Sequence, residues 1–368
     1  MDSMAEVGLV HFARVALEVA EAVLPDYRTK FSKHIFTQPQ LLAVLCLMRY
    51  EDWTLRKTEV RLAEHSELRS ALGLRKAPDH TTLYRFLRRL DERALVAALN
   101  ETVRCLPKAS VHEQEPVATV AVDATGLAPG AISTFYVRRT HNCGGEPMLW
   151  RRWLKWLVVV DTDHRMVLAQ EACSGPYNGS AMLRPLVDAA HQITPLGVVL
   201  ADAEFDSEHN HRHVRDRLAA VSVIPAKRGK ATWQLQGYRA KMQAAFPHQL
   251  YRRRALVESV FSAVKRKLST RAPGRSLEMQ RMQAMLLGLA YNLYRLRHCL
   301  IRSAHHRPHR RMSTEPPDRK AMGRAPAPHR GQQRGCARVA AGGRSQDVAA
   351  PTRGYGIGAQ LDARTAAR

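Results

Sequence analysis

Apolar residues recur every three to four positions through the first 105 residues, which contain almost no glycine. This spacing is typical of helices that bury one face. It predicts an all-α unit over residues 1–110. The expected helices are Val7–Val23, Gln40–Arg49, Leu55–Ala63 and Leu83–Leu99.

A turn near residue 78 divides this unit. The segment Ser66–Gly73 reads as a short helix that ends at a glycine, and Pro78–Thr81 supplies a turn with a capping residue. The next helix is basic, so the pair resembles a helix-turn-helix whose second helix enters a DNA groove. An ordinary corner between two helices with solvated arginines is the alternative. The candidate DNA contacts are Arg85, Arg88 and Arg89.

The pattern changes to alternating and continuous apolar runs from Val117 onward. These runs predict strands, and the helical stretches between the later runs predict a mixed sheet flanked by helices over residues 115–300. Turn residues Asp161 and Asp163 join two of the strands into a hairpin. The expected strands are Val117–Val122, Ser133–Arg139, Trp153–Val160, Arg165–Gln170, Val198–Ala201 and Val221–Ile224, with helices over Met182–His191 and near His209–Leu218.

The apolar pattern is lost in residues 301–368, which are rich in Arg, Ala, Gly and Pro. Such a composition predicts a basic, disordered tail. Two interpretations stay open. The tail is either an arm that grips DNA without sequence preference or the translation of a displaced, GC-rich reading frame.

The balance of charge strongly favours a polyanionic partner. The chain has 57 Lys and Arg against 33 Asp and Glu, a net charge of +24. Residues 302–368 supply 14 of these bases and 4 of these acids, so +14 of the +24 remains without them. Nucleic acid is the first candidate, with a membrane surface second. The six cysteines show no paired spacing typical of zinc or disulfides, and no run is long and apolar enough to span a bilayer or to form a signal peptide. We therefore expect a cytosolic protein without membrane contact.

Two of the buried strands are followed directly by an aspartate. Asp123 follows Val120–Val122, and Asp202 follows Val198–Ala201. Functional side chains tend to gather where strands of a helix-covered sheet end. A lone aspartate at such a place is usually a turn former, but two of them in a basic chain are a less probable coincidence.

A third acid lies in the helical segment that runs from residue 251 to residue 265. At about 100° per residue, Tyr251, Arg254, Glu258 and Lys265 fall within about 60° on a helical wheel. A surface ladder of ion pairs and a site for a metal ion with a phosphate explain this edge equally well. Together with Asp123 and Asp202, Glu258 favours the second, because carboxylates bind Mg²⁺ and two such ions can drive phosphodiester cleavage.

The pattern Tyr251-x2-Arg254-x3-Glu258-x6-Lys265 follows Asp123 and Asp202 in the sequence. Together they resemble the signature of DDE-type transposases of bacterial insertion sequences. The resemblance extends over about residues 35–300. Further matching segments are Pro78–Arg85, Gly175–Gly179, Ala201–Ser207 and Ala290–Arg295.

This resemblance implies an RNase H-like catalytic domain that cleaves and transfers DNA strands. Asp123, Asp202 and Glu258 would be the catalytic metal ligands, for Mg²⁺ or Mn²⁺ and for two ions. Arg254 and Lys265 would contact DNA phosphates or orient Glu258, and Tyr251 would support the helix or the DNA end. The implied partners are double-stranded DNA, as terminal inverted repeats and target, and a second subunit in a homodimer. The implied location is the bacterial cytoplasm, at the nucleoid.

The segment after Asp202 departs from the family pattern. It reads Ala203-Glu204-Phe205, where relatives more often have a basic or small residue and Gly-Tyr. This difference leaves the fine positioning of Asp202 open, and Glu204 has no evident role. We expect Asp206 to cap the helix that follows. A nuclease that cuts without joining and a DNA-binding derivative without catalysis remain as alternatives to a transposase.

Overall fold

A computed structural model describes residues 8–31, 34–106, 117–129, 153–175, 179–227 and 235–305. The expected strand Ser133–Arg139 and the expected disordered tail beyond residue 305 lie outside these ranges. Among the described helices, none combines the length and the apolar character needed to cross a bilayer.

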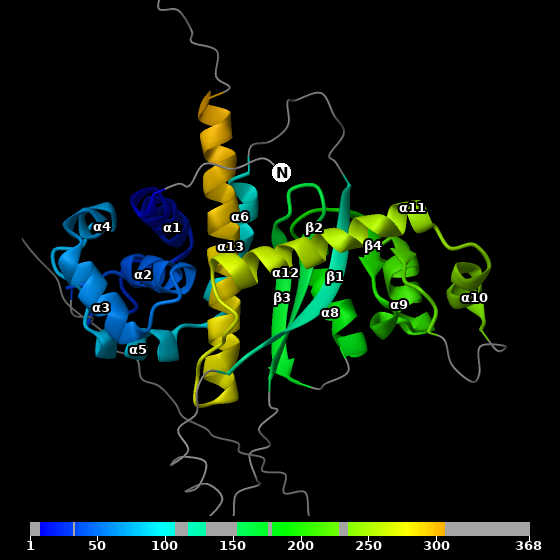
Figure 1. Cartoon of the computed structure of the whole chain (residues 1–368), viewed down its shortest axis with the longest axis horizontal. Helices are drawn as coiled ribbons and strands as arrows, with labels where there is room; N and C mark the ends of the chain where they lie inside the picture. The colour runs from blue at the N-terminus through cyan, green and yellow to red at the C-terminus, as the bar shows by residue number, and fades with distance from the viewer. Residues whose placement is uncertain are drawn as a thin grey trace, which may run out of the picture. The chain divides into compact units, whose positions relative to one another are not determined.

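The described N-terminal part is helical, as the apolar spacing predicts, and consists of six helices (Figure 1). Side chains cap their starts: Thr37 and Gln40 form a reciprocal capping box, and Asp79 accepts a hydrogen bond from the Thr82 backbone N–H at 2.8 Å. The helices are α1 Leu9–Val23, α2 Gln38–Tyr50, α3 Leu55–Glu64, α4 Ser66–Ala71, α5 His80–Arg89 and α6 Glu92–Arg104.

The prediction of a single helix over Leu83–Leu99 is wrong, because the helix is interrupted at Leu90 and Asp91. Asp91 has an extended backbone, and its side chain accepts a hydrogen bond from the Arg93 N–H at 2.9 Å. It therefore caps the start of α6. An aspartate directly before Glu92 is a sequence signal for a helix start. The apolar spacing alone continues across it and therefore predicts one long helix.

A five-stranded mixed sheet forms the second part, in the order β3-β2-β1-β4-β5. β1 pairs antiparallel with β2, and β2 antiparallel with β3, whereas β4 and β5 run parallel to β1. This order and these directions define an RNase H-like fold, as expected. The strands are β1 Ala118–Leu127, β2 Leu154–Asp161, β3 Val167–Ser174, β4 Leu196–Ala201 and β5 Val221–Val223.

Helices and short helical turns connect the strands and follow the sheet. The predicted helix at residues 182–191 is confirmed, and the one near residues 209–218 consists of an α-helical and a π-helical turn. The elements are η1 Gly179–Met182, α8 Leu183–His191, η2 Ala203–Phe205, α9 Glu208–Arg212, η3 His213–Arg217, α10 Gly237–Ala244, α11 His248–Tyr251, η5 Arg252–Arg254, α12 Ala255–Lys267 and α13 Leu277–His305.

Both faces of the sheet are buried, which explains why its strands read as continuous apolar runs. Along β2, Trp156 and Val158 join the core that includes α12 and α13, while Leu157 and Val159 join the core that includes α8. This alternation follows from the two-residue period of a strand. α13 packs against α2, α6 and β3, so the helical part and one face of the sheet share one hydrophobic core (Figure 1).

The segment Ala290–Arg295 of α13 fastens this helix to the β2–β3 hairpin. Asn292 is fully buried; its Oδ1 accepts from the Val167 N–H at 2.9 Å, and its Nδ2 donates to the Val167 carbonyl at 2.8 Å. Tyr291 and Arg295 donate to backbone carbonyls of the hairpin turn. These contacts give the segment a role in holding the sheet.

Candidate active site

Asp123 and Asp202 lie on neighbouring parallel strands at the same level of the sheet. The last paired residues of β1 and β4 are Val122 and Ala201, so the next residue on each strand is an aspartate. Asp123 does not end its strand, contrary to the expectation, because β1 continues antiparallel to β2 as far as Leu127. It lies where β4 stops, which brings both acids to one edge as predicted.

The helical segment that carries Glu258 lies against these strands. α12 packs on β1, and the preceding turn η5 contacts both β1 and β4. The apolar side of α12, which includes Val257, Val260 and Val264, is buried in the core. This anchoring leaves Glu258 at the first turn of α12 with its side chain 57% exposed.

Arg254 connects two of the three acids. Its Nη1 donates to Oδ2 of Asp123 at 2.9 Å, and its Nη2 donates to Oε1 of Glu258 at 2.6 Å. The guanidinium thus lies between a carboxylate of the sheet and a carboxylate of the helix. A two-pronged cation of this geometry is well suited to hold two carboxylates at once.

The surroundings of the acids shift several pKa values. Burial raises the pKa of Asp123 above its usual value, and the nearby charges of Asp202 and Glu258 add to this, against the Ala124 N–H and Arg254. Burial also raises the pKa of Tyr251. For Arg254, burial acts to lower the pKa, but Tyr251 and the three acids outweigh it and raise the value. The acids therefore form one electrostatic unit with a strong preference for a cation.

The three carboxylates are of the chemical type that binds a divalent metal ion such as Mg²⁺. Three carboxylates supply hard oxygen ligands, and the guanidinium between two of them shows that these oxygens attract positive charge. Across the residues that the structure describes, no three His, Cys, Asp or Glu side chains lie close enough together to hold an ion. Arg254 takes up the space between Asp123 and Glu258 in this arrangement.

The remaining residues of the signature flank the acids. The Tyr251 ring lies 5.7 Å from the Arg254 guanidinium and packs edge-on against Phe246 at 5.0 Å. Lys265 is exposed on α12, two turns beyond Glu258. At about 1.5 Å of rise per residue, Lys265 lies roughly 10 Å along the helix from Glu258. At this distance it can contact an extended anion that passes both residues, but not an ion bound by Glu258.

The three arginines expected to contact DNA are exposed on α5. The Arg88 guanidinium lies 5.9 Å from the ring of Tyr84, which is itself 45% exposed. α5 packs against α3 and α2, and Glu59 of α3 holds its first residue, His80. α5 thus presents an exposed basic face that includes an aromatic residue, and its contacts with α2 and α3 hold the helix in place.

The role expected for Asp206 is wrong, because Ser207 caps α9 instead. The Asp206 side chain is fully buried and accepts hydrogen bonds from Arg239 of α10, including one from Nη2 at 2.6 Å. It also accepts from the Lys227 N–H at 2.9 Å. Asp206 therefore fastens α10 to the turn that follows Asp202, a contact over 33 residues that no local pattern indicates.

The sequence interpretation missed a second ion pair beside Asp202, between Lys155 and Glu204. Lys155 is the second residue of the largely apolar strand β2 and is buried. A lysine in such a run is a signal in itself, because a buried ammonium group requires a partner.

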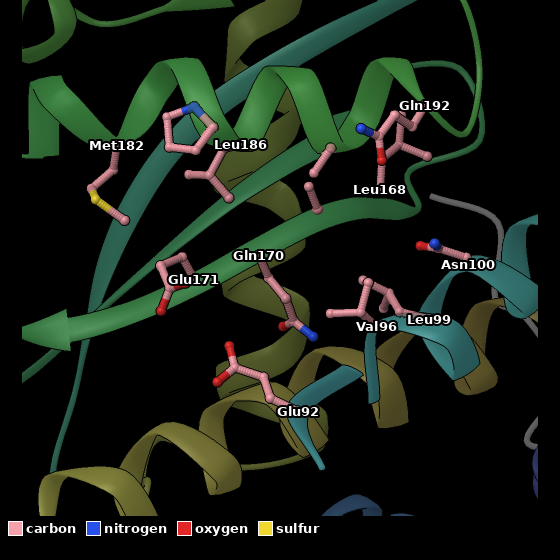
Figure 2. A pocket seen from close by; sticks show the side chains of 13 residues that line it. Glu92, Val96, Leu99, Asn100, Leu168, Gln170, Glu171, Met182, Leu186 and Gln192 are labelled. Atoms are coloured by element: carbon pink, nitrogen blue, oxygen red, sulfur yellow. The ribbon is translucent and has the colours of Figure 1, made fainter. Parts of the chain in front are cut away.

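A separate cavity of about 210 Å³ opens between α6, β3 and α8 (Figure 2). Its wall is mostly apolar, and the carboxylates of Glu92 and Glu171 lie at one end. Arg281 pairs with Glu171 at 2.8 Å. None of the three candidate catalytic acids lines this cavity.

The fold and the acids together define an RNase H-like domain with an acidic edge. Residues 118–293 match the family model described as Transposase DDE domain. This match supports the DDE-type transposase domain that the signature implies, over residues 118–293.

A cryo-EM structure described as the piggyBac transposase synaptic complex with hairpin DNA is similar over 82% of this chain and 77% of its own, at 9% sequence identity and a TM-score of 0.44. No curated protein matches the chain.

Proposed function

We propose that this transposase cleaves DNA at the ends of its insertion sequence and transfers the freed strands to target DNA, with Asp123, Asp202 and Glu258 as catalytic residues. The observation that carries the proposal is the register of β1 and β4, which aligns Asp123 with Asp202, together with Arg254, which binds both Asp123 and Glu258.

The three carboxylates would hold the metal ions, Mg²⁺ or Mn²⁺, and two ions are proposed. When bound there, such ions supply an activated water and neutralise charge on the leaving oxygen of a phosphodiester. Asp123 contributes from the rigid sheet, Asp202 from the end of β4, and Glu258 from the first turn of α12. Because two ligands come from strands and one from a helix, the side of the site away from these elements is left open for DNA.

Arg254 and Lys265 are proposed to bind DNA phosphates. Arg254 can turn from the carboxylates to a phosphate once the acids have another cation, because a guanidinium binds both anions in the same bidentate manner. Lys265 would contact the backbone about two helical turns away. Tyr251, against Arg254 and Phe246, would support this arrangement or the DNA end.

The proposed domain organisation places DNA recognition in residues 1–110, catalysis in 115–300 and a basic tail in 301–368. Arg85, Arg88 and Arg89 of α5 would contact the terminal inverted repeats, since the helix offers an exposed basic face. A homodimer that holds two ends is proposed for the active complex, at the nucleoid.

One experiment separates this function from the two alternatives. The full chain is incubated with Mg²⁺, a labelled duplex that carries the inverted repeats flanking the gene, and a target plasmid. The proposal predicts nicks that leave a 3′-hydroxyl at the repeat end, followed by labelled ends joined to the plasmid. Cleavage without joined product supports the nuclease, and a mobility shift without cleavage supports the DNA-binding derivative. Either result contradicts the proposal.

A further inference from the structure

Lys155 is a buried cation beside the acidic edge. It lies in β2, two positions from the buried Leu157, and is 6% exposed. Its ammonium group forms an ion pair with Glu204 of η2. Burial of a charged lysine is costly unless the charge is paired, so this contact constrains where Glu204 lies.

Glu204 joins three parts of the chain. Its Oε1 accepts from Lys155 Nζ on β2 and from the Gly179 N–H at the start of η1, the second at 2.8 Å. These two contacts hold the carboxylate between β2 and η1. A Cβ at residue 179 would lie 3.1 Å from this oxygen and 3.2 Å from Lys155 Nζ, so a larger residue there would press on both partners of the ion pair.

The same residue controls the orientation of Asp202. The Glu204 backbone N–H donates to Oδ1 of Asp202 at 2.8 Å, so the Asp202 carboxylate caps η2, the turn in which Glu204 is the second residue. Phe205, the next residue, is fully buried and fixes the other side of this turn. The aspartate and its turn thus move together.

We propose that the Lys155–Glu204 ion pair is a positioning element that holds the turn after β4, and thereby sets the orientation of Asp202 and the affinity of the acidic edge for divalent ions. The inference rests on the proposed function, in which Asp202 is a metal ligand. It assigns a role to Glu204, which has none from the sequence pattern alone. Partners that orient metal ligands typically change metal affinity by about 10–100-fold when they are removed.

Two substitutions separate positioning from simple electrostatics. Glu204→Gln removes a negative charge near the site, so electrostatics and positioning both predict weaker binding of a cation. Lys155→Met removes a positive charge with little change in shape, so electrostatics predicts tighter binding. Positioning predicts weaker binding in both variants, because each one releases the same turn.

The experiment measures Mn²⁺ binding to the full chain without DNA, by electron paramagnetic resonance of the free ion. Circular dichroism of each variant establishes that it is folded. The expected result is a loss of about tenfold in Mn²⁺ affinity in both variants. Glu171→Gln is the matched control, since this carboxylate of β3 is ion-paired with Arg281 and has no contact with the three acids. It should bind Mn²⁺ as the wild type does.

Asp202→Asn, measured alongside, distinguishes two kinds of failure. If Asp202→Asn loses Mn²⁺ binding while Glu204→Gln keeps wild-type affinity, the positioning role is overturned and the proposed function stands. Tighter binding in Lys155→Met likewise overturns the positioning role. If Asp202→Asn binds Mn²⁺ as the wild type does, the metal-ligand assignment itself is wrong. Should Lys155→Met not fold, Glu204→Gln decides the matter, because its side chain is already 34% exposed.

Discussion

Arg254 donates a hydrogen bond to Asp123 at 2.9 Å, which links two residues 131 positions apart in the chain. Because the same guanidinium also binds Glu258, a metal ion that bridges these carboxylates has to compete with an internal cation. We therefore expect Arg254 to lower the affinity for metal ions in the free protein and to raise the affinity for DNA in the complex.

Arg254→Gln should tighten Mn²⁺ binding by about tenfold in the absence of DNA, since a hydrogen bond between ionised groups contributes on the order of 1.5 kcal/mol. Calorimetric titration of the full chain measures this. Arg253→Gln is the control, because this neighbouring arginine binds Thr162 and Asp163 and not the three candidate catalytic acids. Weaker Mn²⁺ binding in Arg254→Gln would mean that the guanidinium orients the carboxylates and does not compete for them.

Replacing Arg85, Arg88 and Arg89 together by Gln should weaken binding to a repeat-containing duplex and make it less sensitive to salt. The slope of log affinity against log salt should become shallower by about 0.9 for each arginine that contacts a phosphate. Fluorescence anisotropy at several salt concentrations gives the slope. Arg104→Gln, whose side chain is 72% exposed on α6, is the control. An unchanged slope in the triple variant would rule out these phosphate contacts.

Asn292→Ala should destabilise the fold by about 3 kcal/mol. It leaves the backbone N–H and carbonyl of Val167 without their Asn292 partner in a buried place, and each such group costs about 1–3 kcal/mol, whereas the Thr102 hydroxyl keeps its bond to the Leu99 carbonyl. Urea unfolding measures the change. The exposed substitution Glu67→Gln should stay within about 0.5 kcal/mol of the wild type. A similarly small change in Asn292→Ala would show that these hydrogen bonds do not hold α13 to β3.

Asp206→Asn should reduce stability in a pH-dependent way. Burial acts to raise the pKa of Asp206, but His211, Arg239 and the Lys227 N–H outweigh it and hold the pKa well below its usual value. A depressed pKa contributes stability above the unfolded value, about 3.9, and this contribution is lost as the pH falls.

The difference between wild type and Asp206→Asn should accordingly be about 3 kcal/mol at pH 7 and shrink below pH ~4. Urea unfolding at both pH values gives the two differences. Asp163→Asn, with a side chain that is 60% exposed, should change little at either pH. A constant gap across the pH range would contradict the ionised state of buried Asp206.

The acidic edge was largely predictable from the sequence, because it depends on local patterns. Apolar runs that end at Asp123 and Asp202 predict strands of a mixed sheet, and functional side chains tend to gather where such strands end. The apolar period of residues 257–264 predicts the helix that carries Glu258. These features follow from the periods of strands and helices, which a single chain displays directly.

The contacts that fix the acids were not predictable in the same way. Lys155 and Glu204 are 49 residues apart, and Asp206 and Arg239 are 33 apart. Such pairs form only after the sheet and its helices have assembled, so no local period indicates them. Only the chemistry of single residues gives a hint, such as a lysine within an apolar strand.

The most direct test of the central claim is Mg²⁺-dependent cleavage of the repeat-containing duplex by Asp123→Asn, Asp202→Asn and Glu258→Gln, with DNA binding measured on the same samples. The account predicts that cleavage is lost in all three variants while binding persists. Full cleavage by any one of them would contradict the assignment of that residue as a metal ligand.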